Sequence, residues 1–256
     1  ASAAESTVTQ HLLITGASSG IGEAIARHAA DNHLNVTAIA RRSDRLASLH
    51  DEYPHIHPET ADITDKKQVA AAIARAIKVH GPVDCAILNA GIYQPVDATH
   101  IDSDVFDAHM SVNYSGIVYC LESVIPAMVE RGSGHIAVMG STAGYRGLPR
   151  SAAYGPTKAA VQNLAECLYF DLNPHNIKVQ IINPGFIETE ATAVNDFEMP
   201  DIITAEVAAR DIFAQLKSDR FEIAVPRGFV AKMKLLRLLP LKTYLKLVAH
   251  KTGHLT

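Results

Sequence analysis

Tyr154 and Lys158 form the pair with the clearest capacity for chemistry in this sequence. They lie four residues apart in a segment with helical periodicity, so both side chains project from one face of the predicted helix. A free tyrosine has a pKa of about 10 and is a poor base at neutral pH. A nearby ammonium group favours the phenolate and lowers that pKa. The pair therefore predicts a residue that gives a proton to an alkoxide, or accepts one from an alcohol.

A glycine-rich turn near the N-terminus is the second candidate site. Residues 15–22, TGASSGIG, follow the apolar run 11–15 and precede a helical stretch. Glycines permit a tight turn and a close approach of the backbone, while the amides and the dipole of a helix N-terminus attract phosphate. A purely structural turn is the alternative, but the position between a strand and a helix favours a dinucleotide site. The candidate contacts are Gly16, Ser18, Ser19, Gly20, Ile21 and Gly22.

Further motifs follow in order along the chain. They are Asn89-Ala90-Gly91, Asn113 followed by Gly116, Ser141 placed 13 residues before Tyr154, Tyr154-x-x-x-Lys158, and Pro184-Gly185 before Thr189. Together with the T-G-x-x-x-G-I-G turn, this set resembles the short-chain dehydrogenase/reductase family over about residues 9–228. Leu88 and Gly140 depart from the family pattern, which often has asparagine and serine at these positions.

The resemblance implies a catalytic set of Asn113, Ser141, Tyr154 and Lys158. In the family, the serine hydroxyl holds and polarises the substrate oxygen. The lysine also bonds the nicotinamide ribose, and the asparagine organises a water that resupplies protons. The positive ring of the oxidised nicotinamide, together with the lysine, is expected to lower the tyrosine pKa. Each residue taken alone has a structural explanation, such as a cap or kink in a helix at Asn113. Their combination at the family spacing favours catalysis.

The end of the second predicted strand indicates which nicotinamide cofactor binds. An acidic residue there normally bonds the ribose 2′-hydroxyl of NAD. Ala40 occupies this position, and Arg41 and Arg42 follow it. A guanidinium can bind a 2′-phosphate through two hydrogen bonds, whereas a carboxylate repels it. We therefore expect NADP(H) rather than NAD(H). The resemblance adds cofactor contacts at Asp62, Ile63, Asn89, Ala90, Gly91, Tyr154, Lys158, Pro184, Gly185, Ile187 and Thr189.

Short apolar runs alternate with amphipathic stretches along most of the chain. Runs that are apolar on both faces, separated by helices, are typical of a parallel sheet covered on each side. We therefore expect an α/β fold, a doubly wound Rossmann-like parallel sheet, in a single domain spanning 1–256 with a core of about 9–228. The predicted strands are 11–15, 35–40, 57–61, 84–89, 135–140, 178–183 and 222–225. The predicted helices are 21–32, 43–52, 65–80, 102–113, 116–131, 151–173 and 204–217.

Composition excludes several classes of protein. The net charge of −4 provides no basic field for nucleic acid. Three separated cysteines in apolar stretches indicate buried free thiols in a reducing compartment, and we predict no metal site. Residues 1–10 lack a signal-peptide pattern, and no apolar run approaches the roughly 20 residues of a membrane span. The expected location is the cytoplasm.

The C-terminal extension, 229–256, differs in charge from the rest of the chain. Seven of the 23 Lys and Arg lie from residue 223 onward, where there is no Asp or Glu. A helix–proline–helix of this composition can make a peripheral contact with an anionic membrane, here through 229–251. It can equally form a lid over a greasy substrate channel, or a contact between subunits. These three roles remain alternatives.

The expected substrate is a small-molecule ketone or aldehyde, or the corresponding alcohol. Segment 190–200 is the predicted cover of the substrate pocket, and the candidate lining residues are Tyr93, Tyr145, Arg146, Leu148 and Phe186. The expected function is an NADP(H)-dependent oxidoreductase. The alternatives are a catalytically silent NADP-binding regulator or scaffold, and a membrane-associated reductase of a lipid-like substrate. The resemblance also implies a homodimer or homotetramer, paired through the helices around 102–131 and 151–173.

Overall fold

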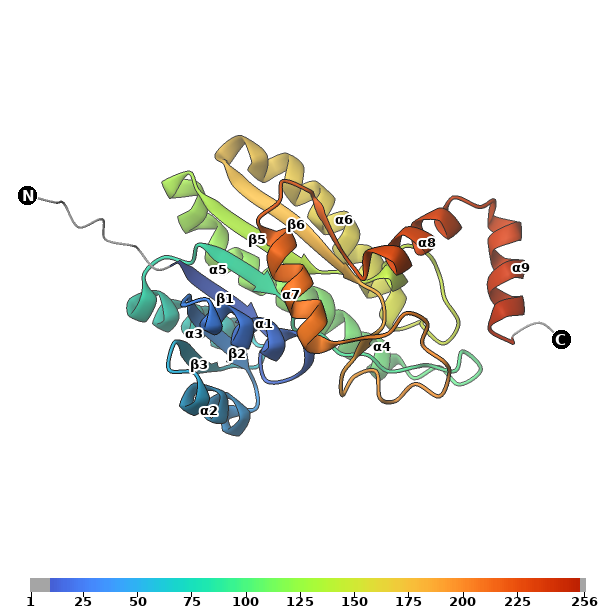
Figure 1. The fold of residues 1–256 in the computed structure, drawn as a ribbon, viewed down its shortest axis with the longest axis horizontal. Coiled ribbons are helices and arrows are strands. Elements are labelled where there is room, and N and C mark those ends of the chain that lie inside the picture. The colour runs from blue at the N-terminus through green and yellow to red at the C-terminus, as the bar shows by residue number, and fades with distance from the viewer. Residues whose placement is uncertain (1–9, 254–256) are drawn as a thin grey trace, which may run out of the picture.

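The computed structural model describes residues 10–253 and contains a seven-stranded parallel sheet (Figure 1). The order across the sheet is β3-β2-β1-β4-β5-β6-β9. The predicted strands are confirmed, with ends that shift by at most one residue. Their bounds are β1 His11–Thr15, β2 Asn35–Ala40, β3 Ile56–Thr60, β4 Cys85–Leu88, β5 Gly134–Met139, β6 Ile177–Pro184 and β9 Glu222–Val225. The predictions for residues 1–9 and 254–256 concern positions outside the described range.

Helices cover both faces of the sheet. One face carries α1 (Gly20–Asp31), α2 (Ser43–Glu52) and α7 (Ala205–Leu216), and the other carries α3 (Lys66–His80), α5 (Gly116–Arg131) and α6 (Tyr154–Leu172). Successive residues of a strand point to opposite faces, so Ile14 packs in the first layer and Leu13 in the second. This burial on both sides explains why the strands are continuous apolar runs, and it confirms the doubly wound α/β fold.

The strand order reverses between β1 and β4. After β1 the chain builds outwards to β3, then returns to β4 on the other side and continues to β9. The loops that leave the carboxyl ends of β1 and β4 therefore diverge, and ligands of open α/β sheets bind in the resulting crevice. The glycine-rich turn follows β1 and the segment 89–91 follows β4. The topology thus brings these two motifs together.

The predicted helix 102–113 is divided in the structure. α4 spans Ser103–Met110 and leads into a π-helical turn, Ser111–Ser115, before α5 begins. Such turns are frequent at functional sites. Here Asn113 bonds the backbone of Ile92 on both sides: Oδ1 accepts from its amide at 2.7 Å and Nδ2 donates to its carbonyl at 3.0 Å. Helical periodicity does not reveal the turn, because it depends on this contact with the loop after β4.

Ser103–Arg131 is, among the described residues, the one helical stretch long and apolar enough to cross a membrane by length and composition alone. Its α5 portion carries Ile117, Cys120, Leu121 and Val124 into the core beneath the sheet. A helix packed on a sheet satisfies the same criterion, so the apolar composition of this stretch is accounted for by the fold.

Two of the three cysteines match the expectation of buried thiols. Cys85 and Cys120 are buried, and burial raises the pKa of each thiol to about 12. The expectation is wrong for Cys167, which is exposed. Cys167 lies two residues beyond the buried Ala165 of α6, and two residues turn a helix through more than half a revolution. Apolar neighbours in sequence therefore do not place it on the buried face.

The segments after β6 complete the fold. β7 (Ile187–Glu188) and β8 (Ile203–Thr204) form a separate two-stranded parallel ribbon, which sequence periodicity does not predict because each strand has only two residues. The extension folds as α8 (Arg227–Arg237) and α9 (Leu241–Lys251), as the helix–proline–helix pattern predicts. Figure 1 shows α9 standing out from the body, at the opposite end of the molecule from α3.

Candidate active site

The glycine-rich turn bends sharply at the end of β1. Gly16 and Gly20 have φ angles of 70° and 57°, which residues with a Cβ rarely adopt. A Cβ on Gly16 would also lie 2.8 Å from the Cα of Ala90, so the turn lies tightly against the loop after β4. α1 begins directly after the turn, and within the described residues no side chain caps its N-terminus. Its first amides are therefore free to bind an anion.

Asn89 joins the loops that follow β1 and β4. Its backbone amide and that of Ala90 both donate to the Thr15 hydroxyl at 3.0 Å. Its Nδ2 donates to the Thr15 carbonyl at 3.0 Å. A Cβ on Gly22 would lie 2.4 Å from this Nδ2. Gly22, predicted as a cofactor contact, instead allows α1 to pack closely against the loop after β4.

A cavity of about 440 Å³, here called the tyrosine cavity, opens between these loops at the carboxyl edge of the sheet. The predicted residues that line it are Gly16, Ser18, Ser19, Gly20, Ile21, Arg41, Arg42, Ile63, Asn89, Ala90, Gly91, Tyr154, Lys158, Pro184 and Thr189. Asp62, Gly185 and Ile187, also predicted, lie outside this lining. The Asp62 carboxylate accepts from the amide and hydroxyl of Thr64. Gly185 lies against Phe229, and Ile187 packs in the core.

Arg42 connects the glycine-rich turn with the segment after β7. Its Nε donates to Ser18 Oγ at 3.0 Å, and its Nη2 donates to Ser19 Oγ at 2.5 Å. Its Nη1 lies 3.0 Å from one carboxylate oxygen of Glu190, and Arg45 binds the other oxygen at 2.5 Å. Hydrogen bonds from Arg45 and Arg42 lower the pKa of Glu190. An anionic oxygen is thus already recognised at the place where a cofactor phosphate was predicted.

Tyr154 is the first residue of α6 and lies on the wall of the tyrosine cavity. The predicted range 151–173 begins three residues before α6, but the position of Pro156 predicts a start close to Tyr154, and the structure confirms this. Pro156 falls in the first turn, where its missing N–H has no partner. The Tyr154 ring meets the Tyr93 ring edge-to-face, with centroids 5.1 Å apart. Desolvation of the hydroxyl raises the pKa of Tyr154 to about 12, while hydrogen bonding with Ser141 acts in the opposite direction. The polypeptide by itself therefore keeps the phenol protonated. The lowered pKa expected from the sequence concerned the tyrosine beside both Lys158 and the positive ring of an oxidised nicotinamide.

Lys158 lies one turn further along α6 and is 2% exposed. Its Nζ lies 5.6 Å from the centre of the Tyr154 ring and donates to the carbonyl of Met139, at the end of β5, at 2.7 Å. Burial lowers the pKa of Lys158 to about 8. The spacing of four residues thus places the ammonium and the phenol on the wall of the same cavity.

Ser141 follows β5 and is 7% exposed. Its Oγ accepts from the amide of Ala143 at 3.1 Å. Gln162, on α6, donates through Nε2 to the Ser141 carbonyl at 3.2 Å and to Asn183 Oδ1 at 2.7 Å. The backbone at Ser141 is therefore held between α6 and β6, next to the tyrosine hydroxyl with which its side chain interacts.

Asn113 is fully buried and connects the π-helical turn to α6. Besides its two bonds to Ile92, its Nδ2 donates to Thr157 Oγ1 at 3.1 Å. Thr157 immediately precedes Lys158 in the sequence. The Asn113 side chain is therefore occupied by protein partners and lies outside the lining of the tyrosine cavity. Its side chain braces α6 against the loop after β4.

Segment 190–200 is fastened across the site by polar contacts. The Tyr93 hydroxyl donates to Asn195 Oδ1 at 2.9 Å. Arg150 Nη1 lies 2.8 and 2.9 Å from the two carboxylate oxygens of Asp196. Both partners of the segment come from loops at the carboxyl edge of the sheet. The structure thus places the predicted cover in a closed position beside Tyr93.

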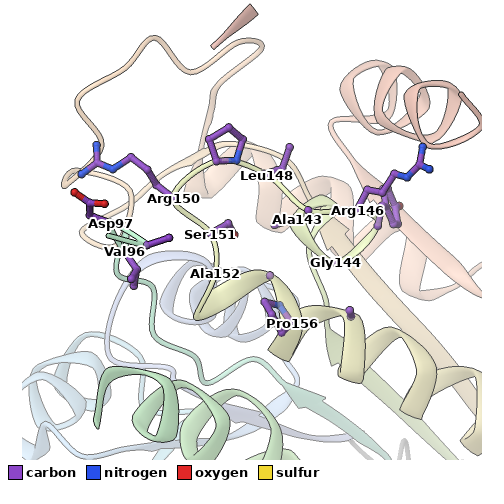
Figure 2. A pocket seen from close by; sticks show the side chains of 16 residues that line it. Val96, Asp97, Ala143, Gly144, Arg146, Leu148, Arg150, Ser151, Ala152 and Pro156 are labelled. Carbon is purple, nitrogen blue, oxygen red and sulfur yellow. The ribbon is translucent and has the colours of Figure 1, made fainter. Parts of the chain in front are cut away.

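A second cavity, of about 840 Å³, lies on the other side of the α6 N-terminus (Figure 2). Tyr145, Arg146 and Leu148 were predicted for the substrate pocket, but they line this cavity, which excludes Tyr154. The helix separates the two spaces, because Tyr154 projects from one of its faces and Pro156 from another. The Tyr145 hydroxyl donates to the carboxylate of Glu222, and Figure 2 shows Arg146 directed toward the C-terminal helices.

Sequence reasoning missed several residues of the tyrosine cavity, namely Ile39, Ala61, Ile92, Val112, Met139 and Gly140, and it placed Glu190 and Ala191 only in the cover 190–200. Ile39 and Met139 end parallel strands, and that position could have identified them. Glu190 had no such signal, because its partner Arg42 is 148 residues away. Phe186, predicted for the pocket, packs between two other rings, with centroid distances of 5.8 Å to Phe197 and 5.5 Å to Phe229.

A parallel sheet wound on both faces, with a glycine-rich turn at the reversal of strand order, defines a nucleotide-binding class of α/β protein. Within that class, the model of the short chain dehydrogenase family matches residues 10–198. The chain therefore belongs to the short-chain dehydrogenase family of oxidoreductases.

Two curated relatives illustrate the range of the family. An uncharacterized oxidoreductase of Myxococcus xanthus is 31% identical over 232 residues, covering 89% of this chain and 92% of the relative. A 3-ketodihydrosphingosine reductase of Dictyostelium discoideum is 30% identical over 214 residues, covering 75% of this chain and 64% of the relative.

Solved structures share the fold over most of their length. A short-chain dehydrogenase from Streptomyces avermitilis has a TM-score of 0.80 at 25% identity, covering 96% of both chains. ElxO with NADP bound has a TM-score of 0.78 at 25% identity, covering 87% of this chain and 99% of ElxO. A 3-ketoacyl-(acyl-carrier-protein) reductase from Brucella melitensis, complexed with NADH, has a TM-score of 0.79 at 26% identity, covering 84% of this chain and 96% of that enzyme.

Proposed function

We propose that this protein is an NADP(H)-dependent oxidoreductase that interconverts a ketone or aldehyde and an alcohol, with Tyr154 as the general acid/base. The observation that carries the proposal is the placement of the buried Lys158 ammonium 5.6 Å from the Tyr154 ring, on the wall of a cavity at the strand-order reversal. A protein that only binds a dinucleotide has no need for an ammonium desolvated beside a phenol. The catalytically silent regulator or scaffold is therefore the weaker alternative.

Tyr154 and Lys158 lie on the cavity wall, and Ser141, which lies outside its lining, interacts with the Tyr154 hydroxyl. These three residues can carry out the proton transfer. When bound, the nicotinamide ring delivers or accepts the hydride. In the direction of reduction, the Ser141 hydroxyl donates a hydrogen bond to the carbonyl oxygen, and the Tyr154 hydroxyl gives its proton to the alkoxide oxygen. Because its pKa is raised to about 12, Tyr154 rests in the protonated form that reduction requires. Lys158 stabilises the phenolate left behind.

Asn113 acts in this scheme as a positioning residue. Its hydrogen bonds to Ile92 and Thr157 hold the loop after β4 and the first turn of α6 at a constant separation. The resemblance assigned it a role through an ordered water. Its satisfied side chain supports a role in bracing Lys158 and Tyr93 instead.

The cavity wall suits a nicotinamide dinucleotide that carries a 2′-phosphate. The free amides of the α1 N-terminus suit the diphosphate, and Gly16 leaves room for a close approach of the backbone. Arg41 and Arg42 line the wall after β2, where there is no acidic residue. Arg42 already binds the Glu190 carboxylate, so a 2′-phosphate must exchange with that group. ElxO, which has the same fold, binds NADP.

A lipid-like ketone is the substrate class that we propose to test first. One relative is a 3-ketodihydrosphingosine reductase, and the predicted cover 190–200 includes Phe197 and Met199. The decisive experiment follows the absorbance of reduced nicotinamide with NADPH and NADH, using ketones, aldehydes, steroids and acyl thioesters. Oxidation of NADPH by at least one carbonyl, lost in Tyr154→Phe, supports the proposal. Absence of turnover across all four classes with both cofactors favours the regulator.

We also propose a homodimer, with a homotetramer as its extension, formed through the outer faces of α5 and α6. On α6, Tyr169 is 42% exposed and Phe170 is 73% exposed, and their ring centroids lie 5.8 Å apart, so the outer face of this helix presents two adjacent aromatic side chains. Sedimentation equilibrium tests this: the wild type should run as an oligomer, and Phe170→Ser should shift it toward the monomer. A monomeric wild type contradicts the proposal.

A further inference from the structure

The corner between α8 and α9 exposes a cluster of leucines. Phe229 and Val230, at the start of α8, are only 8% and 1% exposed and attach the helix to the core. Further on, the exposed fractions rise to 69%, 79%, 60% and 55% for Leu235, Leu238, Leu241 and Leu245. Among the described residues, these are the only leucines in the set of exposed large hydrophobic side chains. We refer to these four residues as the leucine corner.

The spacing of the leucine corner pairs its members within each helix. Leu241 and Leu245 are four residues apart in α9 and share a helix face. Leu235 and Leu238 are three residues apart at the end of α8, and Pro240 separates the two helices. Tyr244, which is 1% exposed, anchors the neighbouring face of α9. The helix therefore has a buried face beside an exposed apolar face.

Lysines without acidic partners flank the leucine corner. Lys232 and Lys234 of α8 pair with Asp201 and Glu222. In α9 the situation differs: within residues 10–253, Lys242, Lys246 and Lys251 form no ion pair. The sequence has no Asp or Glu from residue 223 onward. Lys242 and Lys246 directly follow Leu241 and Leu245, so cations border the exposed apolar face.

The corner is held rigidly to the body of the enzyme. Arg146 Nη1 donates to the carbonyls of Leu239 at 2.7 Å and Arg237 at 3.1 Å. Its guanidinium lies 4.5 Å from the centre of the Tyr244 ring, and the Tyr244 hydroxyl donates to the Gly147 carbonyl at 2.7 Å. The leucines are thus presented outward by a fixed scaffold, which lowers the conformational cost of binding a surface.

We propose that the leucine corner, with Lys242 and Lys246, docks on an anionic lipid bilayer. The leucines enter the boundary between headgroups and acyl chains, and the lysines contact anionic headgroups. Apolar area combined with an unpaired cationic border is the chemistry that peripheral membrane helices use. Docking is independent of the proposed function, because it involves no residue of the tyrosine cavity and needs no turnover.

Charge favours a bilayer over a second copy of the chain at this face. Two copies that met through their leucine corners would bring Lys242, Lys246 and Lys251 of each chain together with no acidic residue of the extension to balance them. An anionic membrane supplies the missing negative charge and buries the same leucines. Self-association through the corner is therefore a separate outcome that the experiment must recognise.

Co-sedimentation of the full chain with vesicles tests the proposal. One set of vesicles contains phosphatidylcholine alone, and the other an equimolar mixture with phosphatidylglycerol. We expect the wild type to bind the anionic vesicles and to dissociate as salt is raised. Lys242→Gln with Lys246→Gln should weaken binding about 30-fold, since each base near an anionic surface contributes about fivefold. Leu241→Ser with Leu245→Ser should weaken it at least about tenfold.

Matched controls come from the opposite end of the molecule. Lys67→Gln with Lys78→Gln changes the net charge equally, and Val79→Ser removes a side chain that is 55% exposed on α3. These variants should bind as the wild type does. Circular dichroism and thermal melting verify that all variants are folded. The four substituted residues of α9 are exposed, so folding should be unaffected.

Three results would overturn the proposal. The first is wild-type protein that stays in solution with anionic vesicles. The second is a loss of binding in the α3 variants as large as in the α9 variants. The third is a concentration-dependent oligomer of the wild type, seen by sedimentation velocity without lipid, that Leu241→Ser with Leu245→Ser abolishes; that result assigns the corner to a second copy of the chain.

Discussion

Arg42 and Glu190, 148 residues apart in the sequence, form an ion pair at the edge of the tyrosine cavity, with Nη1 and the carboxylate oxygen 3.0 Å apart. The same guanidinium bonds Ser18 and Ser19 in the glycine-rich turn. The segment that covers the site is therefore attached to the group proposed to recognise the cofactor. A carboxylate here competes with any phosphate that Arg42 binds.

Removing the charge of Glu190 should strengthen the binding of NADPH. Glu190→Gln releases Arg42 and Arg45 from their carboxylate, and exposed ion pairs of this kind contribute little, so the effect should be small. We expect the dissociation constant of NADPH to fall about two- to fivefold and that of NADH to stay unchanged. Isothermal titration calorimetry measures both. Glu198→Gln, an exposed acid of the same segment, is the matched control, and an equal effect of the two substitutions contradicts the competition.

Arg42→Ala should weaken NADPH binding much more than NADH binding. The guanidinium supplies charge-assisted hydrogen bonds that only a 2′-phosphate requires, so we expect a loss of about tenfold or more for NADPH. Arg45→Ala is the informative comparison, because Arg45 shares the Glu190 contact without lining the cavity. Fluorescence titration with both cofactors provides the measurement. Equal losses for NADPH and NADH would refute the cofactor assignment.

Tyr154→Phe should retain NADPH binding and lose turnover. Positioned general acid/base groups contribute about 10²–10⁴-fold to rate, so kcat should fall by about that factor. Tyr93→Phe removes the neighbouring hydroxyl, which bonds Asn195, and leaves the acid/base in place. Its kcat should stay within about tenfold of the wild type. Steady-state kinetics on a substrate found by the carbonyl screen decides the matter, and a wild-type kcat for Tyr154→Phe would falsify the mechanism.

The buried Lys158 should make stability depend on pH in a defined window. Burial lowers its pKa from 10.5 to about 8. Below about pH 8 the lysine is protonated in both the folded and the unfolded state, and the burial of its charge lowers the free energy of unfolding by its full amount. Between pH 8 and 10.5 only the unfolded state retains the proton, so stability rises with pH. Lys158→Met lacks this rise. Its free energy of unfolding relative to that of the wild type should therefore decrease as the pH is raised from about 8 to 10.

Denaturant titrations of Lys158→Met and wild type at several pH values measure this difference. Lys78→Met removes an exposed lysine and serves as the control for the loss of a surface cation. A difference between Lys158→Met and wild type that stays constant across the window contradicts the assignment of a buried, desolvated ammonium.

Gly22→Ala should destabilise the protein by about 1–3 kcal/mol, because the added methyl must displace well-packed neighbours. A Cβ there would lie 2.4 Å from both Asn89 Nδ2 and the Gly16 carbonyl oxygen. Gly228→Ala is the matched control, since a Cβ at Gly228 meets no atom within 4 Å. Thermal unfolding should show a clear loss for the first variant alone. Equal melting temperatures would show that the turn tolerates a side chain.

Local patterns in the sequence were sufficient for the fold and for the pairing of Tyr154 with Lys158. Buried parallel strands are recognisable because both faces are apolar, and a spacing of four residues places two side chains on one helix face wherever the helix lies. The glycine-rich turn is likewise a local feature, since the backbone angles of Gly16 and Gly20 depend on residues close in sequence. The exposure of Cys167 shows that an apolar stretch does not by itself predict burial, because the position of a residue around the helix decides which face it lies on.

Only the tertiary structure decided which distant groups meet. The contact of Arg42 with Glu190, the bonds of Asn113 to Ile92 and Thr157, and the burial of Lys158 against Met139 all join segments that no periodicity relates. The tertiary structure also assigned Tyr145, Arg146 and Leu148 to a cavity that excludes Tyr154. The physical reason is the same in each case: local sequence sets the face of an element, whereas the packing of whole elements sets what that face meets. For Tyr154, that packing raises the pKa of the phenol in the polypeptide alone, whereas the sequence predicted a lowering by Lys158 together with the charge of the oxidised cofactor.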